Sequence, residues 1–188
     1  MEKRIYKIDA LTQEEMKGVS WQNVAKCPRF EDLRLLKLPY KRLDGTRNEG
    51  EMVVHCSVAE EVLAIFFELM ESNFRIHSVE RIEKYGGSDE KSMAANNSSG
   101  FNFRTIEGSA RLSSHAMGLA IDINPKWNPW VRGGHVSPEN GKPFVDRSIA
   151  HPGLIREEGP AVEAFRKRGW DWGGLWQASK DFHHFQKS

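Results

Sequence analysis

The sequence has only two cysteines, Cys27 and Cys56, among its 188 residues. They form neither a Cys-x-x-Cys motif nor any other spacing typical of a metal site, which excludes a cysteine-based metal centre. The pair is compatible with two free thiols or with one disulfide, and the sequence leaves both open. The chain also lacks a Gly-x-Ser-x-Gly motif, which argues against a serine hydrolase with a nucleophile elbow.

Long hydrophobic runs and an excess of one charge are also missing. No run of about 18 apolar residues occurs, which excludes a membrane-spanning helix. Residues 1–9 have neither an apolar core nor a small-residue cleavage site, so no signal peptide is visible. The 27 basic and 26 acidic residues give a net charge of +1, so charge gives no reason to expect a nucleic acid partner. Without repeats or low-complexity tracts, the length fits one domain over residues 1–188.

Two short segments carry the residues with metal chemistry. Residues 113–122 contain His115 and Asp122, and residues 181–185 contain Asp181 and His184. A catalytic zinc ion usually takes three nitrogen or oxygen ligands from the protein and leaves a fourth position for water. The sequence therefore predicts a Zn²⁺ site with His115, Asp122 and His184 as ligands. A carboxylate beside the metal can accept a proton from the attacking water, and Asp181 is the candidate.

Each of these residues also has a structural alternative. The three ligand candidates can form a hydrogen-bond network without metal. Ser113 is expected to brace the loop before His115, and His183 is either a second-shell or substrate contact or an ordinary structural residue. Histidines without motif partners are expected to lie at the surface or in the packing, and carboxylates near the motifs are expected to be solvated: His55, His77, His135, His151, Glu107 and Asp171.

The pattern Ser-x-His-x-x-Gly-x-Ala-x-Asp, followed downstream by Asp-x-x-His-Phe, resembles the zinc D-alanyl-D-alanine carboxypeptidase family of cell-wall peptidases over roughly residues 80–186. That family includes D,D-dipeptidases of vancomycin resistance and L-alanyl-D-glutamate endolysins, and its zinc fold resembles the Hedgehog signalling domain. The dipeptidases have a glutamate before Trp-His. The ending Asp-Phe-His-His-Phe is closer to the carboxypeptidases and endolysins.

The resemblance implies roles for individual residues. His115, Asp122 and His184 match the zinc ligands and Asp181 matches the general base. Arg104 lies in a segment that resembles the one from which the family presents an arginine to the substrate oxyanion. Phe103 is a departure, because many relatives have cysteine there. Residues 170–176 resemble the family's Gly-Trp-x-Trp-Gly-Gly approach to the last ligand, with Trp172 as a substrate or second-shell residue.

The resemblance also implies a function. We expect a zinc peptidase that hydrolyses peptidoglycan stem peptides, with D-Ala-D-Ala carboxypeptidase as the first choice and L-Ala-D-Glu endopeptidase as the alternative. A non-catalytic zinc-containing binding domain is the alternative of another class. The cell envelope, the periplasm or the extracellular space is the expected location. The stem peptide is the expected partner, and a monomer is the expected state.

The fold class expected is α+β, with a small antiparallel sheet flanked by helices. Residues 1–50 are expected to form an irregular wrapping arm, and residues 80–186 the metal-site core. The helix with the clearest apolar face spans about residues 58–72, with a capping box from Ser57 to Glu60. The long loop at 128–159 is expected to form one wall of the substrate groove. Further expected elements are strands at 52–55, 74–79 and 119–123, a helical turn at 92–95 and a helix at 160–168.

Overall fold

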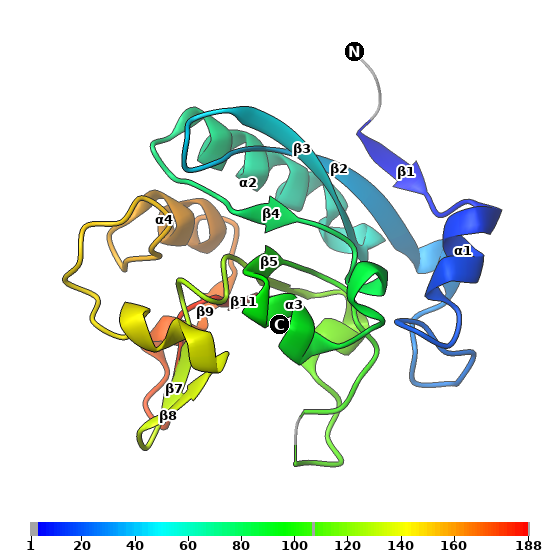
Figure 1. The fold of residues 1–188 in the computed structure, drawn as a ribbon. Coiled ribbons are helices and arrows are strands. Elements are labelled where there is room, and N and C mark those ends of the chain that lie inside the picture. Colours follow the sequence, from blue (N-terminus) through cyan, green and yellow to red (C-terminus); the bar gives the residue numbers. More distant parts are fainter. Residues whose placement is uncertain (1–3, 107, 188) are drawn as a thin grey trace.

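The structure is a computed structural model that describes residues 4–106 and 108–187. It confirms the α+β class, with short helices and small, mainly antiparallel sheets (Figure 1). The helices are α1 (Ala10–Met16), α2 (Ala59–Glu71), α3 (Asp89–Ala94) and α4 (Pro160–Arg166). The strands are β1 (Ile5–Lys7), β2 (Leu33–Lys41), β3 (Arg47–His55), β4 (Ser78–Val79), β5 (Asn97–Ser98), β6 (Ala120–Asp122), β7 (Trp130–Arg132), β8 (His135–Ser137), β9 (Asp171–Trp172), β10 (Lys180–Asp181) and β11 (His184–Gln186).

Three three-stranded sheets organise the described chain. Their strand orders are β1-β2-β3, β10-β7-β8 and β6-β11-β9, with every neighbouring pair antiparallel. Strands β4 and β5 form a separate parallel pair. Two of the three sheets therefore join strands that are distant in sequence, and these two carry the residues singled out above.

The hairpin of β2 and β3 is buried on both faces. Leu36 and Leu38 belong to a large core cluster with α2, α4, β6 and β11, whereas Leu33 and Leu35 pack in a second cluster with the N-terminal segment. This alternation follows from the period of two along a strand. The large cluster extends from Leu36 to Phe185. The two ends of the described chain thus share one core.

The expectation of an irregular arm over residues 1–50 is wrong for residues 33–50. The nine-residue strand β2 and the first four residues of the nine-residue strand β3 lie there, and the predicted strand at 52–55 is only the end of β3. Pro39, which indicates a break in the sequence, lies inside β2. The pairing of β2 with β1 ends at Leu36, so no residue of β1 lies opposite Pro39. The missing N–H of Pro39 therefore costs no hydrogen bond to β1.

The predicted helices are confirmed at 59–71 and 160–166, and the helical turn expected at 92–95 is the end of a helix that spans residues 89–94. The capping box is wrong: the N-cap of α2 is Val58, without a side-chain bond, and the Ser57 hydroxyl instead lies 2.8 Å from His55 Nδ1. The strand expected at 74–79 is reduced to β4. The 128–159 segment contains β7, β8 and a 3₁₀ helix at Glu139–Phe144. None of the described helices is long and apolar enough to cross a membrane.

Candidate metal centre

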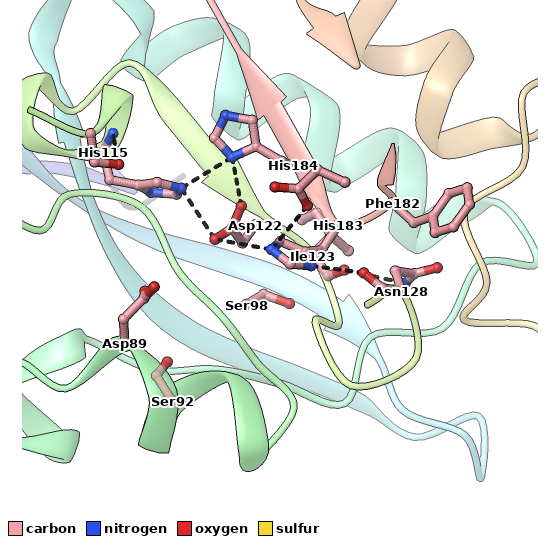
Figure 2. Close-up of polar contacts among 12 residues, drawn as sticks. Asp89, Ser92, Ser98, His115, Asp122, Ile123, Asn128, Phe182, His183 and His184 are labelled. Carbon is pink, nitrogen blue, oxygen red and sulfur yellow. Dashed lines mark hydrogen bonds and ion pairs between the residues drawn. The ribbon is translucent and has the colours of Figure 1, made fainter. Parts of the chain in front are cut away.

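Strands β6 and β11 bring Asp122 and His184 together. The two residues face each other in the antiparallel register, and His184 Nδ1 lies 2.9 Å from Asp122 Oδ1. The strands are short but rigidly placed, because Ile121 and Phe185 beside these residues are fully buried in the core. Two residues 62 positions apart in sequence are thereby fixed against each other (Figure 2).

His115 enters from a 3₁₀ helix, η4 (Ser114–Met117). The Ser113 hydroxyl accepts a hydrogen bond from the His115 backbone N–H, which is the bracing role expected of it. Gly118 ends the helix with φ of 69°, and a Cβ there would lie 2.7 Å from the His55 backbone nitrogen. Glycine is therefore required both by the left-handed conformation and by the close approach of β3. The turn directs His115 Nε2 to 3.1 Å from Asp122 Oδ2.

The outer ring nitrogens of both histidines are already bonded. His115 Nδ1 donates to the Gly100 carbonyl at 2.7 Å, because a carbonyl oxygen can only accept. His184 Nε2 lies 3.2 Å from both the Ser114 hydroxyl and Gln186 Oε1. This leaves His115 Nε2 and His184 Nδ1, which are 3.3 Å apart, facing Asp122. Second-shell bonds of this kind orient histidine ligands in metal sites.

The donor set fits a metal ion. One ligand atom from each of His115, Asp122 and His184 lies within 4.8 Å of the others, and all three residues are buried. Ligand atoms about 2.1 Å from a tetrahedral zinc ion are about 3.4 Å apart, close to the separations of 2.9–3.3 Å found here. Burial alone raises the pKa of Asp122, but His115 and His183 outweigh it and hold that pKa well below its usual range. The carboxylate therefore stays ionised, as a metal ligand must.

Asp181 lies beside this group on another sheet. It faces Trp130 in the pairing of β10 with β7. Its Oδ1 is 3.1 Å from His183 Nε2, but without the alignment of a hydrogen bond, and it has no hydrogen-bond partner among the described residues. Burial raises the pKa of Asp181 although nearby histidines oppose the shift. A buried carboxylate oxygen that accepts no hydrogen bond is available to accept a proton during catalysis.

The ring of His183 is oriented by the backbone carbonyl of Asn128. Its Nδ1 donates to the Asn128 carbonyl at 2.7 Å, and its Nε2 lies 3.8 Å from Asp122 (Figure 2). The same Nε2 also faces Asp181. The ring is buried. Of the two roles open to His183 in the sequence, the geometry favours the second-shell one.

A cavity of about 900 Å³ opens over these residues. Arg104 lines it and pairs with Asp89 at 2.6 Å, while Arg104 Nε has no partner among the described residues. Other lining residues that the sequence gave no reason to select are Trp130, Arg132, His135 and Trp176. His135 is exposed, as expected, but it also lines this cavity. Only the long-range pairing of β7 with β10 brings its hairpin to the cavity, and the local sequence carries no signal of that pairing.

The remaining candidates lie behind or outside the cavity. Trp172 is buried in the core and its indole N–H donates to the Phe182 carbonyl at 3.0 Å, so it braces the residue after Asp181. Phe103 packs against the second core cluster, which explains why an aromatic residue is accommodated there. Asp171 is exposed. Glu107 lies outside the described residues.

Residues 107–187 match the family model described as D-alanyl-D-alanine carboxypeptidase. Over these residues the chain is similar to the D-alanyl-D-alanine carboxypeptidase family. This confirms the resemblance found in the sequence. Comparisons with the curated proteins and with the solved structures give no match. All three metal-ligand candidates and Asp181 lie within the part that matches the carboxypeptidase family, whereas Arg104 and Asp89 lie before it.

Proposed function

We propose that the protein is a zinc-dependent carboxypeptidase that removes the last residue from D-Ala-D-Ala ends of peptidoglycan stem peptides, as a monomer in the cell envelope. The observation that carries the proposal is the buried group of His115, Asp122 and His184 beside Asp181, whose Oδ1 accepts no hydrogen bond from the described residues. All four residues line one cavity. A metal-binding group next to a carboxylate that can accept a proton is what metal-assisted amide hydrolysis requires.

The ligands suit Zn²⁺ because two imidazole nitrogens and one carboxylate leave a tetrahedral position open. A zinc ion held by these residues would supply a water of lowered pKa and would polarise a carbonyl oxygen. Asp181 accepts the proton of the attacking water at Oδ1 and returns it to the leaving amine. Arg104, oriented by Asp89, donates hydrogen bonds to the carbonyl oxygen as negative charge develops on it.

The charges around the cavity favour a carboxypeptidase over an endopeptidase. Arg111 and Arg132 both line the cavity and are exposed, and no ion pair joins either to another described residue. A substrate with a free C-terminal carboxylate offers such guanidinium groups a bidentate partner. Arg132 lies two residues from Trp130, the cross-strand neighbour of Asp181, which corresponds to about 7 Å along the strand.

The test is product analysis by mass spectrometry, with zinc-loaded protein and a stem pentapeptide that ends in D-Ala-D-Ala, and with a chelator-treated control. Loss of one alanine, abolished by chelation, supports the proposal. Release of free L-alanine or of a fragment that begins with D-Glu would instead identify an L-Ala-D-Glu endopeptidase. Bound zinc without any cleavage would favour a non-catalytic binding domain. A pentapeptide with a C-terminal amide is the matched substrate, and we expect it to be cleaved at least tenfold more slowly.

A further inference from the structure

Arg147, in the segment between β8 and α4, is a partly buried arginine without a carboxylate partner among the described residues. Its guanidinium donates four hydrogen bonds of 2.7–3.0 Å to neutral acceptors, which are the carbonyls of Trp127, Phe144 and Ile155 and the side-chain oxygen of Asn128. Burial lowers the pKa of Arg147 to about 10, so it remains charged at neutral pH. These four hydrogen bonds use both terminal nitrogens of the guanidinium, which indicates that its position is closely defined.

The first line of contact runs through Asn128, which is fully buried. Its side-chain oxygen accepts from Arg147 at 2.7 Å and from the Ile155 backbone N–H at 2.7 Å. Its side-chain nitrogen donates to the carbonyls of Ile123, Asn124 and Gly153. With the side chain fixed in this way, the Asn128 carbonyl is directed at His183 Nδ1, 2.7 Å away. Asn128 therefore connects Arg147 to the ring beside Asp181.

The second line of contact runs through Phe182, the residue after Asp181. The Arg147 guanidinium lies over the Phe182 ring at 4.5 Å from its centre, within the range of a cation–π interaction. Strand β10 is only two residues long, so it cannot by itself hold Asp181 firmly. The residues that follow it are instead fixed from one side by Arg147 and Asn128 and from the other by Trp172.

We propose that Arg147 is a positioning residue for Asp181. It holds Phe182 directly and His183 through Asn128, and so keeps the Asp181 carboxylate directed into the cavity. The segment 128–159 then serves to support the proton acceptor, in addition to forming a cavity wall with β7 and β8. The kinetic part of this inference rests on the proposed function.

Arg156 provides a matched control in the same segment. Its guanidinium also donates to backbone carbonyls, those of Arg147 and Ile149, but it is exposed and has no described contact with Asn128 or Phe182. Arg156→Met therefore removes a segment-stabilising arginine and leaves the contacts with residues 182 and 183 in place. A purely structural role for Arg147 predicts similar effects of Arg147→Met and Arg156→Met.

The kinetic experiment compares Arg147→Met, Arg147→Lys and Arg156→Met as zinc-loaded full-length proteins acting on an acylated D-Ala-D-Ala peptide. We expect Arg147→Met to lower kcat about 10- to 100-fold, the effect typical of outer residues around a metal site, with KM and zinc affinity within about twofold of the parent protein. We expect the kcat of Arg147→Lys to lie between those of the parent protein and Arg147→Met, because an ammonium group cannot reproduce the planar fork of the guanidinium. Arg156→Met should keep the parent kcat. Equal losses in Arg147→Met and Arg156→Met, or an unchanged kcat in Arg147→Met, would overturn the inference.

A second readout does not depend on hydrolysis. The ¹⁵N NMR signals of the His183 ring report its bond to the Asn128 carbonyl, and we expect them to shift in Arg147→Met and stay unchanged in Arg156→Met. If the parent protein cleaves no peptide, the proposed function fails while the NMR comparison still tests the positioning of His183. Unchanged His183 signals in Arg147→Met would then overturn the inference. If Arg147→Met does not fold, Arg147→Lys against Arg156→Lys provides the same comparison.

Discussion

Asp181 and His115 share one cavity, yet their replacement should have different consequences. Asp181→Ala removes the proton acceptor and leaves all three ligand atoms in place, so we expect zinc to remain bound and kcat to fall by about 10²- to 10⁴-fold. His115→Ala removes a ligand and should abolish both zinc binding and hydrolysis. Metal content by atomic absorption and the rate of D-alanine release test the pair. Full turnover by Asp181→Ala would show that another group acts as the base.

Gly173 provides a second test at the scale of single residues, because it packs directly against Asp181. A Cβ at Gly173 would lie 2.7 Å from both the Cβ and the carbonyl oxygen of Asp181. We expect Gly173→Ala to displace Asp181 and lower kcat on the order of 10- to 100-fold, because small misplacements of catalytic groups are costly. Zinc affinity should be unchanged.

Gly159→Ala is the control for this substitution. Its Cβ would also make a close contact, 3.1 Å from the Arg156 carbonyl, but Arg156, unlike Asp181, is not among the residues that line the cavity. Steady-state kinetics of both variants measure the difference. Equal kcat values for Gly173→Ala and Gly159→Ala would contradict the steric argument.

Between secondary-structure elements, α2 and the end of α4 are joined by a group of ion pairs. Glu68 on α2 lies 2.6 Å from both Arg168 and Lys167, and Arg168 first, then Lys167, lower the pKa of Glu68 from 4.5 to about 2. A depressed carboxyl pKa stabilises the folded state above the unfolded pKa of about 4.5. That contribution is lost as the pH falls from there towards 2.

Glu68→Gln should therefore destabilise the protein at pH 7 by about 1 kcal/mol, a value limited by the 38% exposure of the carboxylate. The difference from the parent protein should shrink as the pH is lowered from 4.5 to 3. Urea unfolding of both zinc-free proteins at several pH values measures this difference in the free energy of unfolding. Glu71→Gln, whose ion pair with Arg47 is longer at 3.5 Å and more exposed, is the control on the same helix. A difference for Glu68→Gln that does not vary with pH would refute this account.

At the scale of the whole molecule, the centre depends on both halves of the chain. The family match covers residues 107–187, yet the Gly100 carbonyl orients His115 and the β3 backbone contacts Gly118. The core cluster behind Asp122 and His184 also contains side chains from β2 and α2. Metal binding should therefore stabilise the entire fold.

Zinc removal measures this coupling. A ligand at about 1,000 times its Kd stabilises the folded state by about 4 kcal/mol, which corresponds to a Tm increase of about 10 °C for a protein of this size. We expect that difference between zinc-loaded and chelator-treated protein in calorimetry. His115→Ala should show no such difference. Identical melting of the parent protein with and without chelator would mean that the group of His115, Asp122 and His184 does not bind the metal.

Local sequence was sufficient for some elements of the fold. The apolar period of 3.6 identified α2, and a proline start with a glycine after the last turn identified α4. Strand β2 was missed, because a strand buried on both faces by two different clusters shows no simple alternation of apolar and polar residues. Its Pro39 also has the appearance of a break until it is known that the pairing of β2 with β1 ends before this residue.

For the candidate site, the sequence by itself determined which residues have the chemistry of metal ligands and of a base, because donor type and turn-forming residues such as Gly118 are local properties. Only the tertiary structure decided that Asp122 meets His184 across β6 and β11, that β7 aligns Trp130 with Asp181, and that Arg147 supports His183 through Asn128. These contacts join residues that are 19 to 62 positions apart. They depend on strand register and core packing, which the whole chain sets together.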